Sequence, residues 1–307
     1  MMKKNGSRFN MENTFKKERF EQVHADRIHF LNTGYSDAIL LESQGHFAMI
    51  DAAEDTEYPP DKPKLKLPGY EQEVLSYLKK HAAAPDGTVT LDFVLGTHAH
   101  SDHIGGFDTI IDDEKIVVKQ AFLMKYNSSN ITDYEKKFWD NQEVYDQMVA
   151  ALQRKGVPQT DQFPKPDLEF GNFRLKFFNT AYDTSGKKVG ENDNSVAVKV
   201  TKKERSAFLA GDLDNLSGDE KRIAPLVGHV DLLKLGHHGY LGSSSFGFLR
   251  RLSPDLAVAT NSIRRVHGHV RFFLRCFHTR LIPTVENNGI IATFTDDGKI
   301  IITNDIM

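Results

Sequence analysis

The sequence predicts an α/β fold in which two β-sheets pack face to face and helices cover their outer surfaces. Short strand-like runs and helical stretches occur in both halves of the chain. The composition is that of an ordinary globular protein, with 39% hydrophobic and 26% charged residues. We expect one domain over residues 21–307, preceded by a flexible polar tail over residues 1–20.

The first half of the chain predicts a meander of strands followed by a helix. Three strand-like runs are separated by Gly34 and Gly45, and they cover Arg27–Leu31, Ala38–Glu42 and His46–Asp51. Residues 54–68 are acidic and then rich in proline and lysine, which predicts a surface loop. Apolar residues at helical spacing predict a helix over 70–81, and the apolar run 91–95 predicts a buried strand.

Residues 107–165 are expected to form a helical insertion. Thr132 and Glu135 have the spacing of a capping box. The helix that they open is expected to end at Gly156, with Tyr134 and Tyr145 on its buried face. Beyond it, the pattern predicts helices over 216–226 and 245–252, and strands over 173–178, 195–200, 207–210, 231–235, 256–259, 290–294 and 299–303.

A cluster of metal-binding residue types directly follows the predicted strand 91–95. It contains His98, His100, Asp102 and His103, and neutral imidazole and carboxylate are preferred ligands of zinc and related metals. The first two histidines can converge on one ion, while Asp102 and His103 follow the turn and can face a second. Two ions roughly 3.5–4 Å apart form a known hydrolytic device. A polar turn with hydrogen-bonded histidines is the alternative, and it explains four such residues poorly.

Two further predicted strands also end in ligand-type residues. Asp212 follows the strand 207–210, and His237 and His238 follow the strand 231–235. One carboxylate can bind two metals through its two oxygens, so Asp212 could bridge them. An aspartate at a turn and an exposed histidine pair are the alternatives. Three separate strands that end in ligands are difficult to explain by coincidence.

These motifs resemble the metallo-β-lactamase superfamily. The similarity covers residues 27–305, and the segment 48–51 also fits the family's strand that ends in aspartate, here Asp51. It implies an αββα sandwich of two mixed sheets, with metals at the edge where the sheets meet. It also implies that His98 and His100 hold one metal, that Asp102, His103 and one of the pair His237 and His238 hold a second, and that Asp212 bridges them. We favour His238 as the ligand, with His237 contacting the substrate or supporting a ligand. Asp51 would orient a ligand, with capping of its strand end as the alternative.

The chain departs from the family pattern at the first metal. Many members supply a third histidine there, but this chain has no histidine between His103 and Asp212. Asp193, or an asparagine oxygen in the segment 191–195, is the expected substitute, with water as the alternative. We expect two divalent ions, Zn²⁺ in the first instance, while the softer first site also suits Mn²⁺ or Fe²⁺. This departure argues against a β-lactamase and against a thioester hydrolase of the glyoxalase type.

A narrower resemblance points to phosphodiester hydrolysis. The segments 34–42, 192–195 and 211–214 are similar to the phosphorylcholine esterase catalytic module and to the metallohydrolase domain of competence-type DNA-uptake proteins. The expected enzyme acts on a small phosphoester through a metal-bridging hydroxide, with Asp102 and His237 as catalytic residues. If the leaving group carries choline, Trp139 and Tyr240 are candidates to contact it. Core packing is the alternative for Trp139.

Other functions remain open from the sequence. A nuclease would need a basic track, to which Arg250, Arg251, Arg264, Arg265 and Arg271 could contribute, although a net charge of −3 does not favour nucleic acid. A non-catalytic binding module that kept the fold is a further alternative. The single cysteine excludes a disulfide within the chain. Because no run approaches the ~20 apolar residues of a membrane helix, we expect no membrane insertion and a cytoplasmic location, or a secreted one if a leader was removed.

Overall fold

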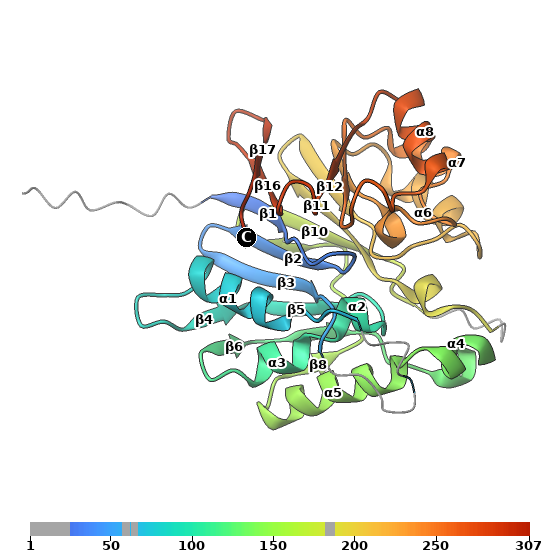
Figure 1. The fold of residues 1–307 in the computed structure, drawn as a ribbon. Helices are drawn as coiled ribbons and strands as arrows, with labels where there is room; N and C mark the ends of the chain where they lie inside the picture. Colours follow the sequence, from blue (N-terminus) through green and yellow to red (C-terminus); the bar gives the residue numbers. More distant parts are fainter. Residues whose placement is uncertain (1–24, 57–61, 63–66, 182–187) are drawn as a thin grey trace, which may run out of the picture.

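The computed structural model describes residues 25–56, 62, 67–181 and 188–307. The expected tail over 1–20 and most of the expected loop over 54–68 lie outside these residues. Two mixed sheets pack against each other and helices cover both outer faces, so the predicted α/β sandwich is confirmed (Figure 1). Among the described residues, no helix combines the length and apolar character needed to cross a membrane.

The first sheet has eight strands in the order β17-β16-β1-β2-β3-β5-β7-β8. Neighbours are antiparallel from β17 to β3 and parallel from β3 to β8. The expected strand 91–95 divides at Asp92, because Leu91 ends β4 (Val89–Leu91), which pairs with β6 (Ile116–Val118) outside this sheet. The strands of the sheet are β1 (Asp26–Phe30), β2 (Ala38–Ser43), β3 (His46–Ala52), β5 (Phe93–Gly96), β7 (Ala121–Leu123), β8 (Gln159–Thr160), β16 (Ile290–Phe294) and β17 (Ile300–Asn304).

The second sheet has seven strands in the order β15-β14-β13-β12-β11-β10-β9. It is antiparallel from β9 to β12 and parallel from β12 to β15. The sequence pattern missed β9 and β15. The strands are β9 (Leu168–Phe170), β10 (Phe173–Phe178), β11 (Ala197–Lys202), β12 (Arg205–Leu209), β13 (Leu232–Lys234), β14 (Leu256–Ala259) and β15 (Arg280–Pro283).

Three buried apolar clusters hold the layers together. One lies between the sheets and contains Phe30, Phe173 and Phe294. The first sheet's outer face packs against helices through Phe107 and Met148, and the second sheet's outer face does so through Phe208 and its neighbours. The first group of helices comprises α1 (Glu71–His81), α2 (Ser101–Ile104), α3 (Phe107–Asp112), α4 (Asp133–Phe138) and α5 (Asn141–Arg154), and the second comprises α6 (Asp219–Val227), α7 (Phe246–Leu252) and α8 (Gly268–Cys276).

The long helix expected after Thr132 is two helices, α4 and α5. The Thr132 hydroxyl accepts a hydrogen bond from the Glu135 backbone N–H at 3.3 Å, as a capping residue does. The chain then becomes extended at Trp139. Because the helix ends there, Tyr134 and Tyr145 do not share one face, and the expected burial of Tyr134 is wrong: it is 68% exposed.

The fold gathers the ends of several parallel strands at one edge. Strand β5 ends at Gly96, β12 at Leu209 and β13 at Lys234. Each is followed within a few residues by one of the motifs identified in the sequence. Ligands of α/β proteins usually bind beyond the carboxyl ends of parallel strands, so this edge is where a functional site is expected.

Candidate metal centre

Two histidines from the turn after β5 point ring nitrogens at one position. The Nε2 atom of His98 lies 3.0 Å from the Nδ1 atom of His100. A carboxylate oxygen of Asp212, from the turn after β12, completes a group whose ligand atoms all lie within 4.8 Å of one another. The three side chains could therefore hold one metal ion.

A second group forms beside the first. The Nε2 atoms of His103 and His238 lie 3.3 Å apart, and Asp102 Oδ2 lies 3.3 Å from His238 Nε2. Asp212 Oδ1 lies 3.1 Å from His103 Nε2, so Asp212 belongs to both groups. The six residues expected to bind metal thus lie close together, and the His238 ring, not that of His237, faces the Nε2 atom of His103.

The other ring nitrogen of each ligand histidine from β5 has its own partner. Asp51 Oδ2 lies 2.7 Å from His103 Nδ1, Glu135 Oε1 lies 2.7 Å from His100 Nε2, and Ser195 Oγ lies 3.1 Å from His98 Nδ1. Such partners fix the ring orientation and tautomer of metal-binding histidines. Asp51 therefore lies where the sequence analysis expects an orienting carboxylate.

The sequence analysis missed Asp37 and Lys234, which are both fully buried beneath the second group. Asp37 Oδ1 lies 3.2 Å from His238 Nδ1, and the same carboxylate forms an ion pair with Lys234. The Lys234 ammonium also donates to the Gly211 carbonyl at 2.8 Å and lies 3.6 Å from Asp212 Oδ1. The sequence did contain a signal for this ion pair. Lys234 lies inside the apolar run 231–235, and a buried lysine needs a charged partner.

The charges of the site favour bound cations. Burial alone would lower the pKa of His103, but Asp212, Asp51 and Asp102 raise it well above its usual range. His238 follows the same pattern, with burial opposed chiefly by Asp212 and Asp37. Raised pKa values favour a bound proton on each ring, and divalent cations held by the facing Nε2 atoms of His103 and His238 would take the place of these protons. The donor set of neutral imidazoles and carboxylates therefore fits the metal centre expected from the sequence.

Comparison with known proteins identifies the fold. The structure aligns with the metallo-β-lactamase fold protein YhfI from Bacillus subtilis at a TM-score of 0.50 and 13% identity, over 91% of this chain and 100% of that one. The chain has the metallo-β-lactamase fold. The CmlA β-hydroxylase E377D mutant aligns at a TM-score of 0.50 and 14% identity, over 84% of this chain and 52% of that one.

Sequence comparison gives relatives among competence proteins, and no family model matches the chain. The ComE operon protein 3 of Bacillus subtilis is 26% identical over 212 residues, which are 66% of this chain and 25% of that protein. Competence protein ComA of Neisseria gonorrhoeae is 25% identical over 185 residues, 60% of this chain and 22% of that protein. The chain thus spans about a quarter of the length of the curated relatives it matches.

The segment expected to replace the family's third histidine is the short helix η3 (Glu191–Asn194). Asp193 Oδ2 accepts a hydrogen bond from the Ser217 hydroxyl at 2.7 Å, and Asp193 lies outside both ligand groups found among the described residues. Glu191 is nearer the motif, because its Oε1 accepts from the Ala99 N–H at 3.1 Å. The structure therefore brings Asp193 to the wall of the adjoining pocket rather than to a ligand position.

A pocket of about 780 Å³ opens beside the candidate metal ligands. Its floor includes His100, Asp102 and Asp212, and its walls include Trp139 and Tyr240. Trp139 is 42% exposed, so core packing does not describe it. His237 also lines the pocket, in a left-handed backbone conformation with φ 46°. The residues expected to contact substrate therefore share one cavity with the ligands.

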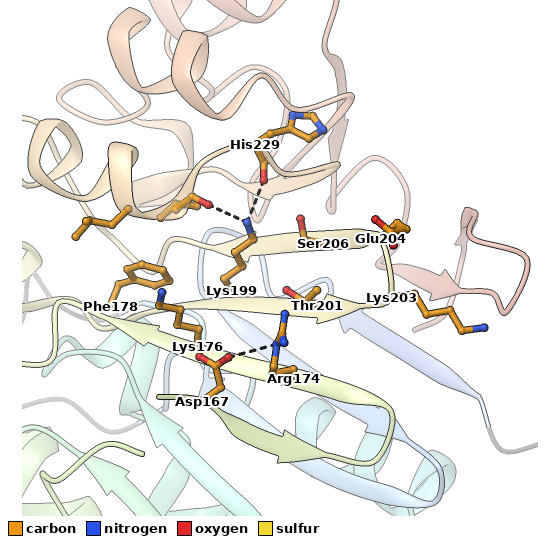
Figure 2. Close-up of a pocket in the computed structure, with 12 residues that line it drawn as sticks. Asp167, Arg174, Lys176, Phe178, Lys199, Thr201, Lys203, Glu204, Ser206 and His229 are labelled. Carbon is orange, nitrogen blue, oxygen red and sulfur yellow. Dashed lines mark hydrogen bonds and ion pairs between the residues drawn. The ribbon is translucent and has the colours of Figure 1, made fainter. Parts of the chain in front are cut away.

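A second hollow, of about 420 Å³, lies on the outer face of the second sheet (Figure 2). Arg174 there pairs with Asp167 at 3.3 Å, and Lys199 donates to the His229 carbonyl at 3.1 Å. Ser206 near the start of β12 lines it, whereas Asp212 follows the other end of that strand. This hollow shares no residue with the metal centre, and its basic groups have partners within the protein.

Proposed function

We propose that this chain is a binuclear metal-dependent hydrolase that cleaves a small phosphodiester. The observation that carries the proposal is two groups of ligand-type residues that share Asp212, one with His98 and His100 and one with Asp102, His103 and His238, beside a large pocket. Two bound divalent ions would neutralise the phosphate and lower the pKa of a water molecule to about 7. The metallo-β-lactamase fold supports this class of hydrolase, while the phosphodiester specificity rests on the motifs.

The residues around the ligands have separate roles in this proposal. Asp51 and Glu135 contact one ring nitrogen of His103 and of His100, which leaves the other ring nitrogen of each histidine available to hold an ion. His237 Nε2 lies 3.9 Å from Asp212 Oδ2, and its ring lines the pocket. His237 is therefore positioned to donate a hydrogen bond to a phosphoryl oxygen of a bound substrate, where developing charge needs stabilisation.

Several pocket residues favour a cationic group on the substrate, such as the choline of a phosphorylcholine ester. Trp139 and Tyr240 offer aromatic faces to a quaternary ammonium. Comparison of p-nitrophenylphosphorylcholine with bis-p-nitrophenyl phosphate tests this specificity, and equal kcat/KM for the two esters would remove the choline assignment.

The decisive variant is Asp212→Ala. We expect it to lose most of the bound metal and at least about a hundredfold in phosphodiesterase kcat/KM, because one residue serves both ligand groups. Asp167→Ala, which removes a carboxylate at the second hollow, is the matched control and should keep both properties. Near-normal activity and metal content in Asp212→Ala would exclude the proposed chemistry.

A nuclease is the second candidate, supported by the similarity to competence proteins. The Arg265 guanidinium lies 4.7 Å from the Tyr35 ring centroid, and Tyr35 lines the pocket. The Nη1 atom of Arg265 also lies 3.4 Å from the hydroxyl of Tyr240. Cleavage of single-stranded DNA that exceeds small-ester hydrolysis, with a strong decrease in DNA binding as salt rises, would favour the nuclease.

A further inference from the structure

Large apolar side chains are exposed on both sides of the opening of the metal-centre pocket. Tyr134 and Trp139, on the α4 side, are 68% and 42% exposed. Leu216 and Leu241, which follow β12 and β13, are 81% and 66% exposed. All four line the pocket, and we call them the apolar rim. Exposed apolar side chains scattered singly are ordinary, but their concentration around one opening indicates an interaction surface.

The leucine side of the apolar rim continues onto the helices of the second sheet. Leu216 and Leu241 also line a smaller hollow of about 170 Å³ together with Phe273 of α8. The Phe273 ring lies 5.5 Å from that of Phe246 and 6.1 Å from that of Phe272, centroid to centroid. Phe246 and Phe272 are 45% and 59% exposed. An apolar surface therefore extends from the pocket opening to α7 and α8.

Cationic side chains accompany this surface. Arg264 and Arg265 precede α8 and are exposed, and Arg275 on α8 is exposed as well. On the other side of the opening, the Lys137 ammonium lies 5.3 Å from the ring centroid of Phe138. Exposed aromatic and aliphatic side chains flanked by arginine and lysine are typical of protein surfaces that lie in a membrane interface, where cations meet anionic headgroups.

We propose that the apolar rim rests on a lipid surface and that the substrate is an amphiphilic phosphodiester drawn from that surface. This inference rests on the proposed phosphodiesterase function. A protein partner or second copy seated on the rim would cover the opening through which substrate must pass, whereas a lipid surface supplies the substrate itself. The apolar chain would lie along the rim leucines and Trp139, with the phosphoryl group at the ligand histidines.

Vesicle binding tests the surface without any turnover. The protein is sedimented with mixed vesicles of phosphatidylcholine and anionic phosphatidylglycerol, because anionic headgroups attract arginine and lysine side chains. The double variant Leu216→Ser/Leu241→Ser should lose about tenfold or more in partitioning, because two leucines no longer leave water. Leu226→Ser is the matched control, since Leu226 is 64% exposed but lines the second hollow. It should bind like the unaltered protein.

Turnover separates this inference from the function on which it rests. The ratio of micellar phospholipid hydrolysis to bis-p-nitrophenyl phosphate hydrolysis should fall in the double variant and in Tyr134→Ser, and stay constant in Leu226→Ser. Vesicle binding that is absent in the unaltered protein or equal in the double variant would overturn the inference, as would concentration-dependent dimerisation lost in that variant. If no soluble ester is cleaved but vesicle binding still depends on the leucines, the proposed function fails while the lipid-facing surface stands.

Discussion

Removal of the Glu135 carboxylate should weaken metal binding at the first site specifically. Glu135 is 6% exposed. Its Oε1 atom lies 2.7 Å from His100 Nε2, and it also accepts hydrogen bonds from Asn141 Nδ2 and the Glu191 N–H, each at 3.0 Å. One carboxylate thus ties a ligand from β5 to α4, α5 and η3. Without it, His100 can rotate and can also adopt the wrong tautomer for binding through Nδ1.

Two magnitudes follow from these contacts for Glu135→Ala. Loss of a carboxylate that orients a metal-binding histidine typically costs ~10–100-fold in metal affinity. The Glu191 N–H and the Asn141 amide would also be left without their shared acceptor, which costs about 1–3 kcal/mol for a buried donor. Glu135→Gln keeps an acceptor oxygen without the charge, so we expect a smaller loss in both quantities.

Zinc titration against a chromogenic chelator, together with urea unfolding of each variant, measures both effects. We expect Glu135→Ala to bind one equivalent of zinc more weakly than the unaltered protein does, and to bind the other equivalent with unchanged affinity. Glu143→Ala is the control, because the Glu143 side chain on α5 is half exposed and forms a surface ion pair with Lys62 at 3.3 Å. If Glu135→Ala loses stability but binds both equivalents as tightly as before, Glu135 supports the fold and does not orient His100.

Three further changes have expected outcomes. Burial raises the pKa of Asp26, but hydrogen bonds from Lys202 and two neutral side chains outweigh burial, and the net effect is a lowered pKa. The stability that the Asp26–Lys202 pair contributes is therefore present above the ordinary pKa of an aspartate, and it is lost as pH falls through the lowered pKa of the folded state. Urea unfolding should show Asp26→Asn less stable at pH 7, with the difference shrinking below about pH 4; a constant difference would contradict this. Phe208→Ala, at a fully buried site, should cost about 3–5 kcal/mol in the same assay, and a loss below about 1 kcal/mol would contradict its core role. Gly211→Ala should lower metal content measured by elemental analysis, because φ is +53° and the new Cβ would lie 2.7 Å from Ser195 Oγ; unchanged content would show that this turn tolerates the change.

Local patterns in the sequence predicted most of the site because its ligands directly follow apolar strands. His98, His100, Asp102 and His103 are held by one turn, so their proximity needs little more than a correct strand end. Asp212 and His238 join them because β12 and β13 are parallel neighbours whose carboxyl ends lie at the same edge. The two-sheet architecture was predictable for the same reason, since strand and helix periodicities are local.

Features that depend on distant contacts were not predictable in this way. The break between α4 and α5 turns Glu135 and Asn141 toward each other and toward His100, although the local pattern favoured one continuous helix. The same break leaves Trp139 at the pocket instead of in the core. Helix α8 was also missed, although Val270, Phe273 and Leu274 have helical spacing in the sequence, so this omission does not come from distant contacts.

The buried Asp37–Lys234 pair also accounts for the charge of the proposed site. Asp37, Asp51 and Asp212 are buried, and Asp102 joins them, so four carboxylates face one ammonium. Glu135 adds a fifth carboxylate, 2.7 Å from the ligand-type residue His100. Two divalent ions would balance these five carboxylates and the single ammonium, and buried charges are far less costly when they are balanced. Lys234 therefore offsets one of the carboxylates and leaves a negative charge that two divalent ions would neutralise.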